Sequence, residues 1–332
     1  MFSFTKDIGM DLGTASVLIY IKDKGIVLNE PSVVALDKNT GKLLKVGADA
    51  QAMLGRTPGQ HHRHPSPARG RHLRLRGHRA HDQGIHRKGA GYPPVQAECG
   101  HLRAVYHTEV EERAVIDAGT QAGAKRVFLV EEPVAAAIGA GININRANGN
   151  LVVDIGGGTT DVAVISLGGI VESTSIKVAG DKFDEAIVKY VRRKHNALIG
   201  DRTAEEIKRT VGCVYPRSEE AIMEVRGRCL MTGLPRTFTV SSSEILDALE
   251  EVSSAIVEAV HWVLERTPPE LTGDISANGI TMTGGGSLIW GFDKLIASKT
   301  GIPTRVADEA VSCVAYGTGN CLENLSKCRT AR

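Results

Sequence analysis

The sequence predicts an α/β fold made of two related lobes. Apolar runs typical of strands alternate with stretches of helical spacing, a pattern that favours sheets covered by helices. Two of these runs lie about half a chain apart, and each ends in an aspartate followed by a glycine-threonine loop, DLGTA from Asp11 and DIGGGTTD from Asp154. A third loop, TGGGS, begins at Thr283. Because ligands of α/β sheets bind beyond the carboxyl ends of the strands, the three loops mark the expected binding site.

Length and composition are those of a globular protein with two domains or with one domain that carries large insertions. The chain has 332 residues, of which 42% are hydrophobic, so it is long enough to bury a sizeable core. No apolar run is long enough to cross a bilayer and no signal peptide is recognised, so a cytoplasmic location is expected. The six cysteines form no CxxC pair, which indicates neither a zinc site nor a disulfide framework.

In the first half of the chain, strands are expected on both sides of the first glycine loop. Pro31 interrupts the strand pattern that follows them. Glu131-Glu132-Pro133 opens an alanine-rich helix, because the first helical turn accepts proline. The expected strands are 7–11, 15–21, 25–36 and 126–130, and the expected helices are 109–122 and 134–141.

In the second half, strands again flank the glycine loop, and a serine at position 241 is a suitable cap for a long helix. The expected strands are 151–153, 162–166, 169–178 and 280–282, and the expected helices are 184–195, 203–211 and 241–265.

The composition of the paired loops indicates a site for the phosphate chain of a nucleotide. Glycine lets backbone N–H groups approach phosphate oxygens closely, and threonine hydroxyls are further donors. Asp11 and Asp154 are suited to hold Mg²⁺ through its water molecules. Asp161 is either a further partner of that ion or a turn residue, and two ordinary tight turns are the alternative for the loops. The residues expected to hold phosphate are Gly13, Thr14 and Ala15 from one side and Gly156, Gly157, Gly158 and Thr159 from the other.

Residues 60–107 differ in composition from the rest of the chain. They contain nine of the eleven histidines, eight arginines and one lysine, against two acidic residues. A nucleic-acid patch or a metal-binding tract has such a composition, but the block shows neither helical nor strand periodicity. A changed reading frame explains it better, so no nucleic-acid partner is expected.

The frame hypothesis rests on what the neighbouring frame encodes. Read from the second base of each codon, HRAHDQGIHRKG at residues 78–89 can encode TEHMIKEFIEKV, one of the sequences that codon degeneracy allows, and this has the pattern of an amphipathic helix. As written, the block lacks an apolar pattern, and it is therefore expected to be disordered.

Longer stretches of the chain resemble a known family. The paired loops, EEPVAAAIGAG from Glu131 and the TGGGS loop are similar to the superfamily of actin, sugar kinases and heat-shock chaperone ATPases. IGMDLGTASVLIYIKDKGIVLNEPSVVALD near the start, VVDIGGGTTDVAVISLGGIV and AGDKFDEAI resemble the bacterial actins MreB and Mbl. The likeness covers roughly residues 5–58 and 108–325. The alternative frame of the basic block also resembles this family.

The resemblance implies an actin-like ATPase fold, in which two related ribonuclease-H-like domains surround a nucleotide cleft. The first lobe would span residues 1–145, with residues 60–107 as its small outer subdomain. The second lobe would span 146–325, with a small-subdomain insertion at about 182–250, followed by a tail of 326–332.

The same resemblance assigns roles to further residues. Glu132 would orient the water that attacks ATP, with Glu131 as the neighbouring alternative; capping of the helix also explains an acid here. Glu205 and Lys208 would contact the adenosine, although their spacing also fits an ordinary surface ion pair. The residues expected to border the adenosine or line the same cleft are Gly180, Asp181, Glu205, Glu206, Ile207, Lys208, Gly284, Gly285, Gly286 and Ser287.

The implied function is that of an ATP- and Mg²⁺-dependent cytoskeletal protein. It would polymerise into paired filaments at the inner face of the cytoplasmic membrane and direct lateral cell-wall synthesis, with slow ATP hydrolysis coupled to polymerisation. Phe2 and Phe4 are either a membrane contact or part of a frayed end. The alternatives are a sugar-type kinase, for which no catalytic base in a substrate insertion is found, and a chaperone ATPase, for which no peptide-binding domain follows.

Overall fold

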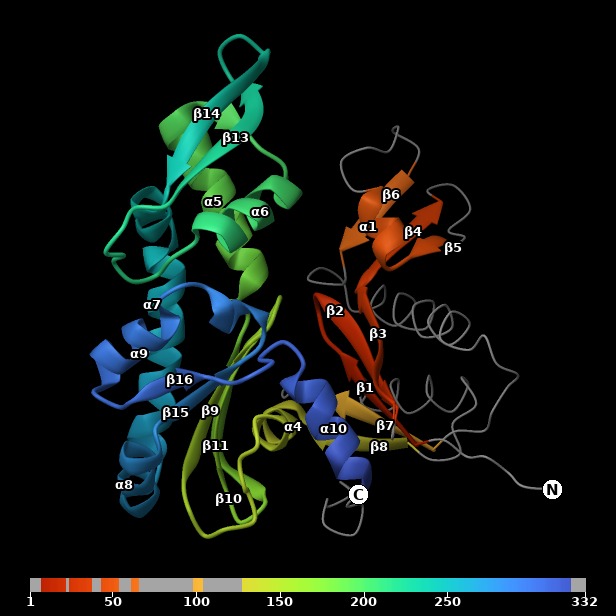
Figure 1. The fold of residues 1–332 in the computed structure, drawn as a ribbon, viewed down its shortest axis with the longest axis vertical. Coiled ribbons are helices and arrows are strands. Elements are labelled where there is room, and N and C mark those ends of the chain that lie inside the picture. Colours follow the sequence, from red (N-terminus) through yellow and green to blue (C-terminus); the bar gives the residue numbers. More distant parts are fainter. Residues whose placement is uncertain are drawn as a thin grey trace, which may run out of the picture. The chain divides into compact units, whose positions relative to one another are not determined.

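The computed structural model describes residues 7–21, 24–37, 43–53, 61–65, 98–103 and 127–323. These residues form two compact units (Figure 1). Unit 1 contains the described residues up to Arg146, Leu167–Gly169 and those from Val311 onward, and unit 2 contains Ala147–Ser166 and Ile170–Ala310. The division falls close to the expected lobe boundary, but the residues from Val311 onward belong to unit 1, whereas a second lobe running to residue 325 was expected.

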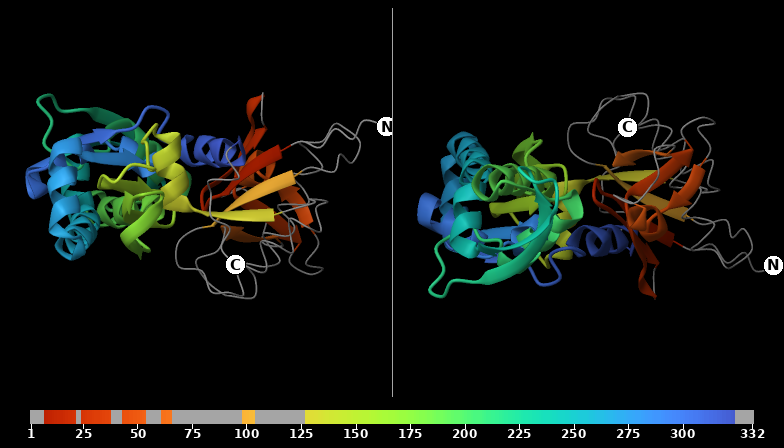
Figure 2. Two further views of the ribbon diagram at one scale, coloured as in Figure 1. Left: turned by 90° about the horizontal axis from the view of Figure 1, so that it is seen from below. Right: turned by 90° about the horizontal axis from the view of Figure 1, so that it is seen from above.

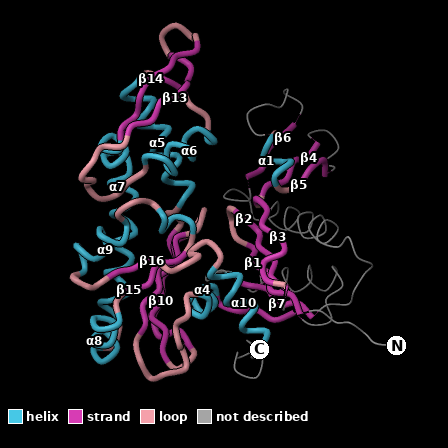
Figure 3. Tube along the Cα trace, in the orientation of Figure 1, coloured by secondary structure: helices cyan, strands magenta, loops and turns pink. Residues whose placement is uncertain are grey.

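Unit 1 is built on a mixed five-stranded sheet with the strand order β3-β2-β1-β7-β8 (Figure 3). β1, β2 and β3 pair antiparallel, whereas β1, β7 and β8 run parallel to one another. Met10, Val17 and Ile19 form a small buried cluster on this sheet. The strands are β1 Asp7–Leu12, β2 Ser16–Ile21, β3 Gly25–Pro31, β7 Glu98–Arg103 and β8 Val127–Glu131.

A smaller antiparallel sheet of unit 1 has the order β5-β4-β6, and the short helix α1 packs against it. A single residue, Ser32, separates β3 of the large sheet from β4 of the small one. The elements are β4 Val33–Asp37, β5 Leu43–Val46, α1 Ala48–Ala52 and β6 His61–Pro65.

Two of these strands lie within the basic block, so the expectation that the whole block is disordered is wrong for them. β6 pairs antiparallel with β4, and β7 lies hydrogen-bonded between β1 and β8. Strand pairing uses backbone N–H and C=O groups, which are present whatever the side-chain pattern. The missing apolar alternation therefore did not exclude pairing. Residues 60, 66–97 and 104–107 of the block lie outside the described residues.

Two helices of unit 1 are α4, Glu132–Gly139, and α10, Cys313–Glu323. They pack closely against each other (Figure 1), because small residues lie at their contact. A Cβ on Gly139 would collide with the carbonyl of Cys313, and one on Gly317 with the carbonyl of Ala135. α10 also contacts β1. This packing explains why the C-terminal helix belongs to unit 1.

Unit 2 is built on a second mixed five-stranded sheet, with the order β11-β10-β9-β15-β16. β9 and β10 pair antiparallel, and β9, β15 and β16 run parallel. Like the sheet of unit 1, it joins an antiparallel hairpin to parallel strands, as expected for a duplicated fold. The strands are β9 Asn150–Ile155, β10 Thr160–Ser166, β11 Gly169–Ile176, β15 Ile280–Thr283 and β16 Thr304–Val306.

Helices pack against this sheet and against each other. α5 contacts α7, α7 contacts β10, α8 contacts β9, and α9 contacts β16; Figure 2 gives two further views of these elements. The helices are α5 Gly180–His195, α7 Ser242–Arg266, α8 Pro269–Asn278, α9 Phe292–Thr300 and the 3₁₀ helix η1 Gly285–Leu288.

The rest of unit 2 is a small antiparallel sheet of order β12-β13-β14 with helix α6 beside it. Its long hairpin was not predicted, because only Val225, Phe238 and Val240 of its two strands are buried and the apolar alternation is correspondingly weak. The elements are β12 Ala197–Leu198, α6 Asp201–Val211, β13 Ile222–Cys229 and β14 Pro235–Ser241.

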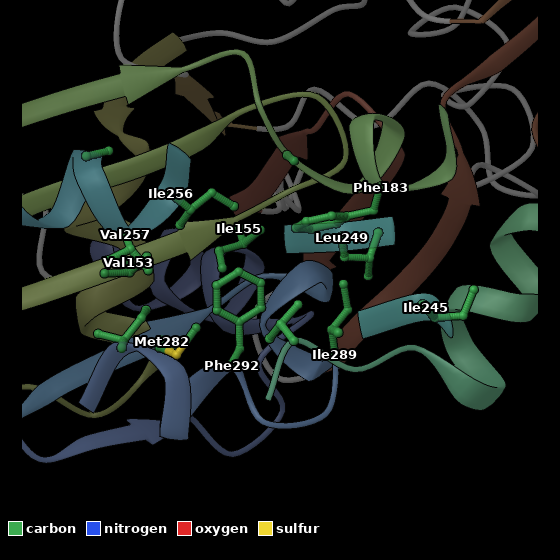
Figure 4. Close-up of a cluster of buried hydrophobic side chains, with 14 of the residues drawn as sticks. Val153, Ile155, Phe183, Ile245, Leu249, Ile256, Val257, Met282, Ile289 and Phe292 are labelled. Atoms are coloured by element: carbon green, nitrogen blue, oxygen red, sulfur yellow. The ribbon is translucent and has the colours of Figure 1, made fainter. Parts of the chain in front are cut away.

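A large apolar cluster forms the core of unit 2. Phe183 of α5 and Phe292 of α9 are fully buried and meet edge to face, with ring centroids 6.1 Å apart. Ile155 of β9 and Leu249 of α7 lie in the same cluster (Figure 4). Aromatic pairs of this geometry contribute about 0.5–1.5 kcal/mol beyond the burial of their surface. The pair therefore joins two helices across the core.

The expected serine cap of α7 is confirmed. Ser241 Oγ accepts a hydrogen bond from the N–H of Glu244, and Glu244 Oε2 accepts one of 2.9 Å from the N–H of Ser241. This reciprocal capping box satisfies two N–H groups at the helix start. The expected strands and helices between 127 and 283 are likewise present within a few residues, whereas the expected helix 109–122 and the aromatic residues Phe2 and Phe4 lie outside the described residues.

Replacing Phe292 by alanine is expected to lower the free energy of unfolding by about 3–5 kcal/mol, because it leaves a cavity beside Phe183. Leu234 is a matched control, since 64% of it is exposed, and Leu234→Ala is expected to change stability by at most about 0.5 kcal/mol. Urea denaturation followed by circular dichroism measures both. Equal losses in the two variants would contradict this description of the core.

Candidate functional site

The second glycine loop lies between β9 and β10 and is held by the first turn of α5. The N–H of Gly156 donates to the carbonyl of Thr159 at 2.9 Å, which closes the turn. The N–H of Gly180 donates to the carbonyl of Gly156 at 3.1 Å, and that of Asp181 to the carbonyl of Gly157 at 2.8 Å. The start of α5 thus binds the loop from its carbonyl side.

These contacts decide where the loop's N–H groups point. In a trans peptide the C=O and N–H bonds point in opposite directions, so the N–H groups of Gly157 and Gly158 are directed away from α5. Among the described residues, neither N–H makes a hydrogen bond. Adjacent backbone N–H groups of this kind form an anion-binding concavity. The arrangement therefore fits a phosphate group.

The third glycine loop lies against the end of β9. Thr283 pairs with Asp154, and the residue after it, Gly284, has a φ of +80°. A Cβ at Gly284 would collide with the carboxylate of Asp154 and the carbonyl of Ile155. Ser287 Oγ donates to the carbonyl of Gly284 at 2.7 Å. Within unit 2, the second loop therefore lies against Gly180 and Asp181 and against the third loop. All of these residues were expected at the nucleotide site.

Helix α6 contributes a cation that is tied to α5. Lys208 Nζ donates to Asp184 Oδ2 at 2.9 Å and to the carbonyl of Gly180 at 3.1 Å. Burial raises the pKa of Asp184 to about 6, although the ammonium of Lys208 acts in the opposite direction. Lys208 therefore bonds to the first turns of α5. The spacing of Glu205 and Lys208 in the sequence did not predict this contact.

The other expected residues of α6 differ in exposure. Ile207 is fully buried in the core of unit 2, so its side chain packs against protein. Glu205 is half-buried and Glu206 is exposed. Of these three, Glu205 and Glu206 present side chains that a ligand could reach.

Two buried carboxyl groups lie directly opposite each other on β9 and β10. Asp154 pairs with Asp161 in the strand register, and they are 3% and 2% exposed. Burial raises the pKa of Asp161 to about 6, whereas hydrogen bonds from the side chains of Ser175 and Thr159 act to lower it. Two acids in such a position favour a nearby cation or a shared proton. Asp161 is therefore part of the carboxyl pair rather than a plain turn residue.

The first glycine loop, in unit 1, is also held from its carbonyl side. Ser32 Oγ donates to the carbonyl of Gly13 at 2.7 Å, and the N–H of Ser32 donates to the carbonyl of Ala15 at 2.9 Å. Asp11 at the end of β1 is buried, which raises its pKa to about 7, and a hydrogen bond from the backbone of Gly13 acts to lower it. Ser32 was not predicted, because an isolated serine after a proline is typical of many turns.

Glu131 and Glu132 lie at the junction of β8 and α4 in the same unit. Glu131 ends the strand and is exposed, and Glu132 begins the helix and is half-buried. β8 is parallel to β7, and β7 is parallel to β1. The two acids therefore lie at the same edge of the sheet as Asp11 and the first loop.

The residues that the structure describes contain neither a cluster of metal ligands nor a membrane-spanning helix. No group of three or more His, Cys, Asp or Glu side chains there could hold a metal ion by itself. In the same part of the chain, no helix is both long and apolar enough to cross a membrane.

A family model described as MreB/Mbl protein matches residues 5–65 and 104–330. The chain is 48% identical to the cell shape-determining protein Mbl of Bacillus cereus, over 98% of both chains. It is 47% identical to the cell shape-determining protein MreB of Escherichia coli, over 96% of this chain and 94% of that one. The unmatched stretch 66–103 lies inside the basic block.

Solved structures show the same fold. MreB5 of Spiroplasma citri bound to ADP superposes with a TM-score of 0.92 at 38% identity, over 98% of both chains. The MamK double helical filament superposes with a TM-score of 0.81 at 19% identity, over 96% of this chain and 99% of that one, which supports the fold alone. The chain therefore belongs to the MreB/Mbl protein family and has its actin-like fold.

Proposed function

We propose that this chain is an ATP-binding cytoskeletal protein that polymerises and takes part in determining cell shape. The observation that carries the proposal is the second glycine loop, whose N–H groups at Gly157 and Gly158 are free of other described residues and turned away from α5. Relatives named as cell shape-determining proteins support the cellular role. The MreB5 structures bound to ADP and to AMPPNP support the nucleotide.

The phosphates of ATP are assigned to the two glycine loops. Gly157, Gly158 and Thr159 of unit 2 would donate backbone N–H groups, because the Thr159 hydroxyl is already bonded to Asp161. In unit 1, Thr14 and Ala15 would donate N–H groups, and Thr14 its hydroxyl as well. The adenosine is assigned to Glu205 and to the loop Gly284–Ser287. Lys208 would support this site indirectly, through Gly180 and Asp184.

Mg²⁺ fits the donors that the structure provides. Asp11, Asp154 and Asp161 are buried carboxyl groups at strand ends, and carboxylate oxygens are the ligands that Mg²⁺ prefers. Because Mg²⁺ usually keeps several of its water molecules, Asp11 and Asp154 would hold it through water. When bound, the ion would neutralise charge on the phosphates.

Slow ATP hydrolysis coupled to polymerisation is assigned to the junction of β8 and α4. Phosphoryl transfer to water needs mainly positioning and charge neutralisation. Glu132 would accept a hydrogen bond from the attacking water and orient it, with Glu131 as the alternative. A half-buried position favours Glu132, because water exchanges less freely there.

The finer cellular roles follow from the family alone. Paired filaments, association with the inner face of the cytoplasmic membrane and guidance of the lateral cell-wall machinery are proposed on that ground. A sugar-type kinase is not favoured, because relatives at 47–49% identity over nearly the whole chain are named cell shape-determining proteins.

We also propose that residues 60–107 are written in a shifted frame. The family model resumes at residue 104 after ending at residue 65, which supports a local anomaly within an otherwise matching chain. Resequencing fresh DNA across the codons for Gly59 to Thr108 is expected to show a base gained or lost on each side of the block. An unbroken frame encoding the block as written would refute the proposal.

The Gly284→Ala variant is expected to bind ATP about tenfold more weakly or worse, because it strains a positive φ and pushes a methyl group into Asp154 and Ile155. Gly273→Ala on α8 is the control, since an added Cβ there meets no atom within 4 Å. Titration with a fluorescent ATP analogue measures both affinities. Unchanged affinity in Gly284→Ala would count against a nucleotide at this loop.

The Glu132→Gln variant is expected to lower the rate of ATP hydrolysis about 100-fold while leaving ATP affinity close to that of the wild type, because the amide keeps the size of the side chain but is a weaker acceptor for the attacking water. Phosphate release under single-turnover conditions measures the rate. Glu131→Gln is the matched comparison, and the reverse pattern would assign the role to Glu131. Full activity in both variants would contradict the assignment to this junction.

A further inference from the structure

We propose that Ser32 is a positioning residue for phosphate binding, acting through the first glycine loop. This inference rests on the proposed nucleotide-binding function. Ser32 does not belong to either glycine loop, and no sequence motif indicated it. Its role follows from its burial, from its two hydrogen bonds and from its place between two sheets.

Ser32 holds the loop at two points. Its side chain donates to the carbonyl of Gly13 at 2.7 Å, and its backbone N–H donates to the carbonyl of Ala15 at 2.9 Å. The residue is only 6% exposed. Water therefore has little access to replace the hydroxyl as the donor to Gly13.

The bond to Gly13 sets the direction of the next N–H group. The carbonyl of Gly13 and the N–H of Thr14 belong to one peptide group, and they point in opposite directions. With the carbonyl held by Ser32, the N–H of Thr14 is directed away from Ser32, and it has no hydrogen-bond partner among the described residues. This peptide thus presents a fixed donor to an anion.

The geometry also explains why the loop needs an external donor. A Cβ at Gly13 would lie 2.9 Å from the carbonyl oxygen of Ser16, so glycine is required there. Glycine leaves the backbone free to rotate, and the Gly13–Thr14 peptide would turn more easily without a partner for its carbonyl. The Ser32 hydroxyl supplies the restraint that the glycine lacks.

Ser32 also connects the two sheets of unit 1. It is the single residue between β3, which ends at Pro31, and β4, which begins at Val33. β3 belongs to the large sheet of unit 1 and β4 to the small one. The glycine loop is therefore hydrogen-bonded to the connection between the two sheets.

The test compares ATP with AMP, which lacks the β- and γ-phosphates assigned in part to the first loop. In the full chain, Ser32→Ala is expected to weaken ATP binding about fivefold to tenfold, the value of one buried hydrogen bond, and to change AMP binding less than about twofold. Displacement of a fluorescent ATP analogue gives both affinities, and thermal unfolding is recorded in parallel.

Ser253→Ala is the matched control. Ser253 is also a buried serine, and its Oγ donates to the backbone carbonyl of Glu250 at 3.1 Å, but it lies within α7 of unit 2. This variant is expected to lose some thermal stability and to keep the wild-type ratio of ATP to AMP affinity. A change in that ratio confined to Ser32→Ala supports the positioning role.

Three results would overturn the inference, and they differ from one another. An unchanged ATP affinity in Ser32→Ala would show that the hydroxyl does not position the loop. Equal weakening of ATP and AMP would show that its role is only structural. A wild-type chain that binds neither nucleotide would remove the proposed function together with this inference, and the wild-type titration alone identifies that case.

Discussion

The orientation of a few peptide groups is the constraint on which the rest of the site depends. When another part of the fold holds the carbonyl of a peptide group, the N–H of that same group points in a fixed, opposite direction and can be presented to an anion. In unit 2 the first turn of α5 holds the carbonyls of Gly156 and Gly157, and in unit 1 Ser32 holds those of Gly13 and Ala15. The two units use different donors, a helix start and a serine, for the same purpose. Loops of similar sequence in the two units are thus held by different parts of the fold.

Buried acids are the second feature that both units share. Asp11 and Asp161 have pKa values raised by burial to about 7 and about 6, so their ionised forms are disfavoured in the absence of a positive charge. Asp154 lies opposite Asp161 across the strand pair. A cation beside a buried acid would favour its charged form, which is the electrostatic basis for the proposal that these acids hold Mg²⁺. Asp184 has an internal cation, the ammonium of Lys208, which acts to lower its pKa although burial still raises that pKa to about 6.

Packing between small residues decides which unit the C-terminal helix joins. α10 follows the third glycine loop in sequence, yet it packs on α4 of unit 1 through Gly139 and Gly317. Such a contact has no apolar signature along the chain, because it depends on the absence of side chains. The basic block provides the opposite case. Its side-chain pattern excluded packing, but β6 and β7 still pair through their backbones.

The sequence by itself determined the α/β class, the duplication, the positions of three glycine loops and the serine cap of α7, since each depends on residues close together in the chain. It also showed the family likeness. Only the tertiary structure decided that Ser32 supports the first loop, that Lys208 acts on Gly180, that Ile207 is buried in the core, and that α10 belongs to unit 1. Apart from the burial of Ile207, these contacts join residues 17 or more positions apart through a hydroxyl, an ammonium or a bare backbone. Such groups leave no periodic pattern in the chain, so their partners are known only once the strands and helices have packed.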